Sequence, residues 1–84
     1  MIYTVYALYS SKFSKIYIGY TSDIKNRLDS HNIYSTKGYT SKFRPWILVY
    51  TEEYPSKAMA IKREKQLKSA AGRKFIWELI SKLN

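Results

Sequence analysis

Glu64 is an acidic residue on the expected inner side of a helix predicted over residues 57–70. At about 100° per residue, its side chain falls in the same arc as Ala60 and Leu67, which faces the core. A buried carboxylate without a partner is costly. Glu64 could pair with Lys68, four residues further on, or it could bind a hard divalent cation such as Mg²⁺. Position on the helix alone favours the ion pair, and it leaves the metal site open.

Arg27 and His31 lie four residues apart on another predicted helix, over residues 24–32. At helical spacing both side chains lean toward the neighbouring sheet. Their stems could simply cover apolar surface at the edge of the helix. Alternatively, the guanidinium could bind a phosphate while the imidazole assists proton transfer. Either residue alone is a weak signal, because a lone histidine is more often structural than catalytic.

Tyr6 and Tyr17 lie on two predicted strands at the start of the chain, and they share one face if these strands pair. Gly19 in the second strand indicates either a bulge or a close approach to the backbone. A tyrosine is a poor base at its reference pKa of about 10, but cations such as Arg27 or Lys37 would favour its phenolate. Strand propensity explains the tyrosines equally simply.

The segment 33–44 interleaves aromatic and cationic side chains without a regular period, which predicts a basic, aromatic loop. Cations beside aromatic rings suit phosphate contact combined with base stacking, although runs of charge are often only solvated faces. With the net charge of the chain added, nucleic-acid contact is the better interpretation. The expected contacts are Lys37, Lys42 and Arg44 in this segment, with Lys65 and Lys68 on the helix over 57–70.

The composition limits what these residues can belong to. The 84 residues carry 15 Lys and Arg against 6 Asp and Glu, for a net charge of +9, so we expect one basic domain over 1–84. The chain has no Cys and one His, which excludes disulfides, a thiolate metal site and a multi-histidine zinc site. Its apolar runs are too short for a membrane span, and we expect a soluble, untargeted, cytoplasmic protein.

Hydrophobic periodicity predicts the elements that position these side chains. We expect the order β-β-α-β-α-α, an α+β fold in which helices flank a three-stranded, largely antiparallel sheet. The unbroken apolar third strand is expected in the middle of the sheet or buried on both faces, followed by a turn over 52–55. Gly72 is expected to end the helix over 57–70. The predicted strands span 2–9, 16–21 and 46–51, and the predicted helices 24–32, 57–70 and 73–83.

The order of these residues along the chain resembles the GIY-YIG nuclease domain. More narrowly, the chain is similar to the small stand-alone bacterial GIY-YIG proteins over about residues 3–80. The first motif reads Thr-Val-Tyr rather than Gly-Ile-Tyr, a change that keeps the tyrosine. The resemblance is carried by Thr4-Val5-Tyr6, Tyr17-Ile18-Gly19, Thr21, Arg27, His31 and Glu64 within the stretch 60–65.

The resemblance implies metal-dependent hydrolysis of phosphodiester bonds in DNA, duplex or branched, as in repair or recombination. It implies that Tyr6 is the general base or activates the attacking water, and that Tyr17 supports that water. Arg27 would hold the scissile phosphate, and His31 would assist proton transfer. Glu64 would be the sole protein ligand of one Mg²⁺ or Mn²⁺, with phosphate and water completing the shell.

The length of the chain bears on specificity, because larger relatives owe target choice to an added DNA-binding domain. We therefore expect low sequence specificity, or a partner protein that supplies it; the oligomeric state is left open. One alternative keeps the scaffold as a non-catalytic, basic nucleic-acid-binding module. Another is an RNA- or ribosome-associated basic protein.

Overall fold

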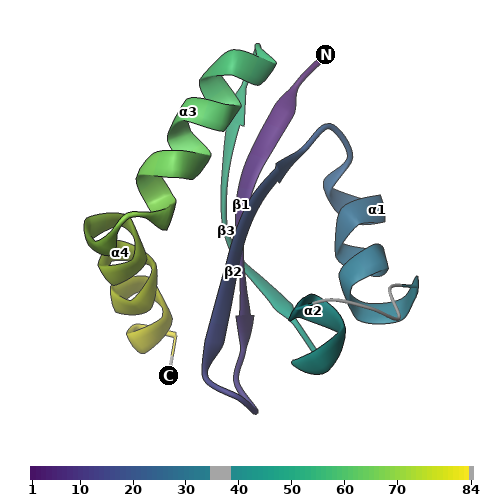
Figure 1. Ribbon diagram of the computed structural model, residues 1–84, viewed down its shortest axis with the longest axis vertical. Coiled ribbons are helices and arrows are strands. Elements are labelled where there is room, and N and C mark those ends of the chain that lie inside the picture. The colour runs from purple at the N-terminus through teal and green to yellow at the C-terminus, as the bar shows by residue number, and fades with distance from the viewer. Residues whose placement is uncertain (35–38, 84) are drawn as a thin grey trace.

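A three-stranded antiparallel sheet lies between two layers of helices (Figure 1). The computed structural model describes residues 1–34 and 39–83. β1 (Tyr3–Ser10) and β2 (Lys15–Thr21) form the N-terminal hairpin, and β3 (Ile47–Tyr54) pairs with the other side of β1, which gives the order β2-β1-β3. The predicted α+β class, the antiparallel sheet and the order of its main elements are confirmed.

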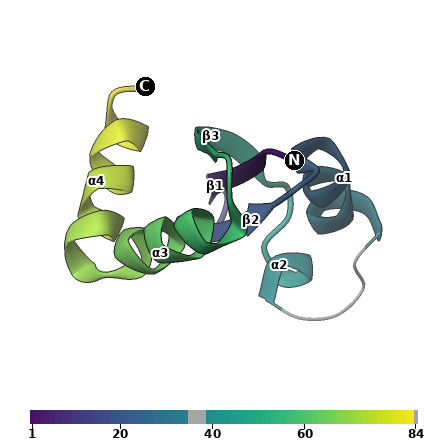
Figure 2. The ribbon, with the colours of Figure 1, turned by 90° about the horizontal axis from the view of Figure 1, so that it is seen from above.

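One face of the sheet is covered by α3 (Lys57–Lys68) and α4 (Ala70–Ser81), on the left of Figures 1 and 2. Because side chains alternate along a strand, Val5 and Ala7 of the central strand both point to this side. The fully buried side chains of this layer are aliphatic, partly buried aromatic rings pack around them, and together they fix the two helices on the sheet. Its buried members are Val5, Ala7, Ile16, Ile18, Ala60, Leu67, Ile76 and Ile80.

The opposite face is covered by α1 (Ile24–Asp29), the π-helical turn η1 (Ser30–Tyr34) and the short α2 (Tyr39–Lys42). Tyr6 and Leu8, the alternate residues of β1, point to this side. This second core has aromatic rings among its buried members, which the first does not. It combines buried Tyr6, Leu8 and Trp46 with partly buried Tyr17, Ile24, Leu28 and Phe43.

The predicted place and end of the third strand were wrong. β3 is an edge strand, and its Ile47 and Leu48 are 51% and 40% exposed, whereas the central strand is β1. The apolar run therefore indicates a high propensity to form a strand, and not burial on two faces. β3 also continues through the expected turn to Tyr54, because residues 52–54 still pair with the start of β1.

Gly72 does not end a helix, contrary to the sequence prediction. α3 ends at Lys68, and Ser69 caps both helices: its Oγ donates to the Gln66 carbonyl at 2.6 Å and accepts from Gly72 N at 3.3 Å. A Cβ on Gly72 would lie 2.4 Å from the Leu67 Cα. The glycine is needed where the start of α4 passes close to the end of α3.

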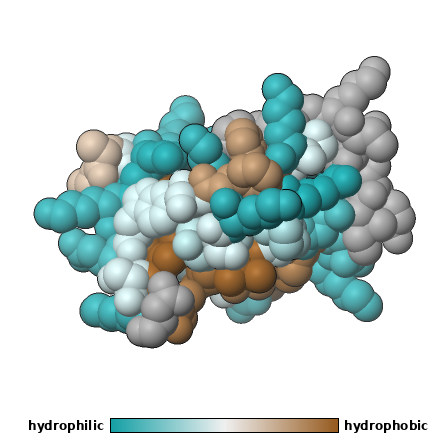
Figure 3. Space-filling model, turned by 90° about the horizontal axis from the view of Figure 1, so that it is seen from below, coloured by the Kyte–Doolittle hydropathy of each residue, from teal (hydrophilic) through white to brown (hydrophobic). Residues whose placement is uncertain are grey.

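The segment that was predicted as a loop over 33–44 contains the end of η1 and the helical turn α2. Within the described ranges, no helix is both long and apolar enough to cross a membrane. Figure 3, a view from the end below Figure 1, shows hydrophilic side chains that project around this face, with hydrophobic ones gathered between them. Every described lysine is exposed, so much of the positive charge faces the solvent, as contact with an anionic partner requires.

Candidate functional site

Tyr6, Tyr17 and His31 meet on the α1 side of the sheet and form what we call the Tyr–His cluster. The Tyr6 hydroxyl lies 3.0 Å from His31 Nε2, and both residues are buried. The ring centres of Tyr17 and His31 are 4.8 Å apart, and those of Tyr6 and Tyr17 are 6.3 Å apart. The hairpin and the first helical segment therefore bring three of the predicted site residues into contact.

Gly19 makes room for this cluster. It pairs directly with Tyr6 in a hairpin without a register shift, so it marks a close approach and not a bulge. A Cβ at this position would lie 2.7 Å from the Tyr6 hydroxyl and 3.3 Å from the Tyr17 ring. Only a residue without a side chain lets the Tyr6 ring lie across β2.

His31 reaches Tyr6 from η1, where the predicted regular helix over 24–32 widens into a π turn. The Arg44 Nε donates to the His31 carbonyl at 2.7 Å. The Asn32 side chain pairs with the Trp46 backbone, donating to its carbonyl at 2.9 Å and accepting from its N–H at 2.7 Å. These bonds fix the turn that carries the imidazole.

Sequence analysis missed Asn32 and Trp46 as positioning residues. The residue type of Asn32 could have indicated this role, because an amide side chain can both donate to a backbone carbonyl and accept from a backbone N–H, as a neighbouring strand does. Trp46 is only 2% exposed, and its indole N–H donates to the Thr40 carbonyl at 2.7 Å. A tryptophan that is buried this deeply needs a partner for its N–H, which anchors α2 under the site.

Burial, more than the charges around the cluster, keeps the Tyr6 phenol neutral. Burial raises the pKa of Tyr6, the neighbouring Tyr17 and Glu64 raise it further, and Arg27 opposes them without reversing the shift. Arg27 does favour the phenolate, as expected, but burial outweighs its effect. Burial, with a smaller effect of Arg27, lowers the pKa of His31. The neutral imidazole can accept the Tyr6 hydroxyl proton at Nε2, which places its own proton on Nδ1.

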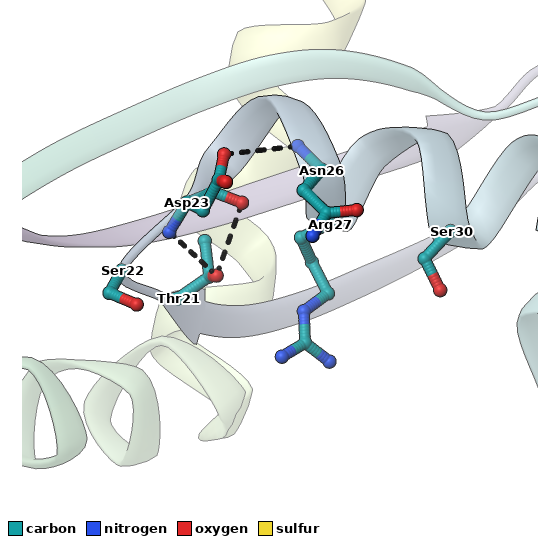
Figure 4. A pocket seen from close by; sticks show the side chains of 6 residues that line it. All are labelled: Thr21, Ser22, Asp23, Asn26, Arg27 and Ser30. Carbon is teal, nitrogen blue, oxygen red and sulfur yellow. Dashed lines mark hydrogen bonds between the residues drawn. The ribbon is translucent and has the colours of Figure 1, made fainter.

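Arg27 lies at the rim of an open cavity of about 360 Å³ (Figure 4). Asp23 begins α1 there, because its carboxylate accepts from Asn26 N at 3.1 Å while its own N–H donates to Thr21 Oγ1 at 3.0 Å. Figure 4 shows the Arg27 side chain extending away from these bonds. Among the described residues, its guanidinium has no hydrogen bond or ion pair, so its donors are available to an anion.

Glu64 is sheltered, with a side chain that is 16% exposed, and its carboxylate lies 3.6 Å from Lys68 Nζ. The predicted i,i+4 ion pair is present. Glu64 also lies close enough to Tyr6 to influence its pKa across the edge of the sheet. In the described part of the chain no three His, Asp or Glu side chains are grouped to hold a metal ion. Glu64 is a hard oxygen donor, so it fits a cation whose remaining ligands are phosphate and water.

The predicted nucleic-acid contacts are spread over the two helical layers. Lys42 on α2 and Lys65 on α3 are exposed, and Lys68 is the partner of Glu64. Arg44 is half-buried and holds η1 through the His31 carbonyl. Lys37 lies outside the described residues.

Comparisons with known proteins agree with this arrangement. The GIY-YIG catalytic domain matches residues 2–76 of the chain. A UPF0213 protein of Staphylococcus haemolyticus is 38% identical over 58 residues, which cover 69% of this chain and 71% of that protein. A UPF0213 protein of Staphylococcus aureus is 41% identical over 54 residues, which cover 64% and 66%. The solution NMR structure of a UPF0213 protein from Bacillus halodurans is similar over 94% of this chain and 85% of that chain, with a TM-score of 0.55 and 32% identity.

Proposed function

The chain belongs to the GIY-YIG family of nuclease domains, and from that premise we propose that it is an endonuclease that hydrolyses phosphodiester bonds in DNA with the help of one divalent cation. The observation that supports this best is the buried contact of 3.0 Å between the Tyr6 hydroxyl and His31 Nε2. A phenol and a neutral imidazole in this order form a short path along which a proton can leave an attacking water.

The proton path begins at Tyr6. Because burial keeps this phenol protonated, Tyr6 is not a phenolate before the reaction. It passes its proton to His31 Nε2 as it takes one from water. His31 can accept that proton because burial lowers its pKa and keeps the imidazole neutral. Tyr17 packs against the imidazole and limits where the water can sit.

Arg27 is the residue that we assign to the scissile phosphate. Its guanidinium is exposed at the open cavity, and its positive charge acts on both Tyr6 and His31. A guanidinium there would orient the phosphate toward the cluster and offset the negative charge that builds up during attack.

Glu64 is the residue that would hold Mg²⁺ or Mn²⁺. When bound, such a cation supplies a positive charge that stabilises the transition state of phosphodiester hydrolysis. Lys68 now neutralises this carboxylate, and binding of the cation would take over that role. The domain offers no second DNA-reading element within the described residues, so we propose low intrinsic sequence specificity.

The test is cleavage of supercoiled plasmid, branched DNA and single strands by the purified protein, with Mg²⁺, with Mn²⁺ and with chelator. We expect metal-dependent nicking by wild type that Glu64→Gln abolishes. Lys62→Ala, which alters an exposed cation elsewhere on α3, serves as the control and should cleave normally. Equal inactivity of wild type and Glu64→Gln on all three substrates, with DNA binding retained, would instead support the non-catalytic binding module.

A further inference from the structure

Two open cavities with cationic rims lie along the edge strand β2, one at each end. The first, of about 480 Å³, is lined by Tyr3, Tyr20, Thr21, Ser22, Arg27 and Lys57. The second, of about 430 Å³, is lined by Ile16, Tyr17, Ile18, Lys68 and Arg73. The described lining residues of the two cavities include no carboxylate, so both favour an anionic ligand.

The two cavities reach the proposed reaction centre from opposite ends of β2, because Arg27 lines the first and Tyr17 lines the second. α3 contacts β2 with its start near the end of the strand and its last residue near the beginning, so the two elements run in opposite directions. Lys57 and Lys68 thus mark the two ends of this helix. Glu64 lies between them, about one turn before Lys68 and about two turns after Lys57.

The distance fits one nucleic-acid strand. The 12 residues of α3 span about 18 Å at 1.5 Å per residue. Phosphates of one strand of B-DNA rise by about 3.4 Å each along the helix axis and lie further apart along the winding backbone, so a few consecutive phosphates fit along this span. Tyr3 and Tyr20 add half-buried rings to the first cavity, which suits the nucleotide attached to a bound phosphate.

We propose that these two cavities bind successive phosphates of the cut strand: the first holds the phosphate at Arg27 and a neighbouring one at Lys57, and the second holds a phosphate on the other side of Arg27, at Lys68 and Arg73. The strand would then run along the outer edge of β2, parallel to the strand axis. The inference rests on the proposed function, to which it adds Lys57 and Arg73 as substrate-positioning residues. Lys68 would exchange its contact with Glu64 for a phosphate once a cation neutralises that carboxylate.

Lys62→Ala is the matched control for this test. Lys62 is also an exposed lysine on α3, but it lines a different cavity together with Tyr54 of β3, the opposite edge strand of the sheet. Lys57 and Arg73 are exposed as well, so their truncation should leave the melting temperature unchanged. All three variants lose one positive charge, and only the location of that charge differs.

The first measurement is the affinity for a labelled DNA duplex in chelator, between 50 and 200 mM salt. Each lost phosphate contact lowers the slope of log affinity against log salt concentration by about 0.9. Over this range the loss of affinity of Lys57→Ala and of Arg73→Ala should therefore be smaller than that of wild type by a factor of roughly three to four. Lys62→Ala should follow wild type. Equal slopes for all four proteins, or equal reductions in all three variants, would overturn the proposal.

The second measurement places single uncharged methylphosphonates along one strand of the same duplex. A methylphosphonate that weakens binding of wild type but not of Arg27→Ala marks the phosphate at Arg27, which we take as the centre. Lys57→Ala should lose sensitivity to a methylphosphonate on one side of that centre only, and Arg73→Ala on the other side only. Loss on the same side in both variants contradicts the proposed path.

These binding measurements need no cleavage, so the two proposals can fail separately. If the two variants show the two-sided pattern but wild type never cuts DNA, the endonuclease proposal is refuted and the strand path stands. Wild type that cuts DNA while both variants bind as it does would refute the strand path alone.

Discussion

Two clusters in this small domain use tyrosine hydroxyls as hydrogen-bond donors, and they do so in opposite electrostatic settings. In the Tyr–His cluster on the α1 side, the Tyr6 hydroxyl lies against Nε2 of a neutral imidazole, to which it donates when the ring proton is on Nδ1. On the α3 side, Tyr50 and Tyr54 both donate to the carboxylate of Glu52, which Arg63 Nε also contacts at 3.0 and 3.1 Å. We call Glu52, Tyr50, Tyr54 and Arg63 the Glu52 cluster.

The difference lies in whether a proton has somewhere to go. Burial alone would raise the pKa of Glu52, but the bonds from Arg63 and the two tyrosines outweigh it and hold this pKa below its usual value. A carboxylate so saturated with donors accepts no further proton near neutral pH, so this cluster ties β3 to α3. The imidazole of His31 has an acceptor atom with one phenol on it, and that arrangement can pass a proton. The same residue type thus serves structure at one face and, in the proposed function, proton transfer at the other.

The largest expected effect comes from removing one hydroxyl from each cluster. We expect Tyr6→Phe to lower kcat/KM for DNA cleavage by about 100- to 10,000-fold, because general acid–base catalysis is lost. Tyr50→Phe should leave kcat/KM unchanged and cost about 1 kcal/mol of unfolding free energy. Cleavage kinetics and urea unfolding of both variants check the contrast, which breaks down if the two phenylalanine variants cleave alike.

Gly19→Ala tests the Tyr–His cluster by displacing the Tyr6 ring while keeping its hydroxyl. Its Cβ would lie 2.7 Å from the Tyr6 hydroxyl, so the ring must move and the 3.0 Å contact with His31 Nε2 must lengthen. We expect cleavage to fall at least about tenfold, since a shift of about 1 Å at a catalytic group is enough. The variant should retain metal-free DNA binding. Wild-type kinetics in this variant would show that the position of the phenol does not matter.

Glu52→Gln is the corresponding change in the structural cluster. The amide keeps the shape but removes the charge that accepts from Arg63, and the Glu52 side chain is 19% exposed, so solvent recovers part of the loss. We expect a destabilisation of about 1–2 kcal/mol, with kcat unchanged at temperatures where the variant is folded. Thermal unfolding monitored by circular dichroism measures the first effect. A fall in kcat without any loss of stability would mean that the Glu52 cluster acts on the chemistry.

The smallest expected effect is a difference in the pH at which the two clusters lose their function as the solution is acidified. The folded-state pKa of His31 lies below 6.5, so cleavage should fall as the pH drops through that lowered pKa and protonates Nε2. The folded-state pKa of Glu52 lies below 4.5, so its contribution to stability is present above pH 4.5 and is lost as the pH falls through the lowered value. We expect an interval in which the protein is folded but inactive, and in which activity returns on neutralisation. Coincident loss of activity and of circular dichroism would remove the distinction.

Sequence reasoning predicted the fold class, the hairpin and the shared face of Tyr6 and Tyr17, because the two-residue period of strands fixes which side chains point together. It could not predict that β3 is an edge strand, since an apolar run carries no information on which strand is central. It also missed the neutrality of Tyr6, which depends on burial between layers that the sequence does not show. The support of His31 by Asn32 and Arg44 depends on long-range contacts with the segment before β3.

The π turn η1 has a consequence for what evolution can change here. A π turn contains one more residue per turn than an α-helix, so a deletion within Ser30–Tyr34 would convert it into regular helix. That conversion would rotate the following or preceding side chains by about 100° and carry the imidazole out of line with the sheet, although every reacting group would still be present. The spacing of this short stretch should therefore tolerate substitutions far better than it tolerates a change in length.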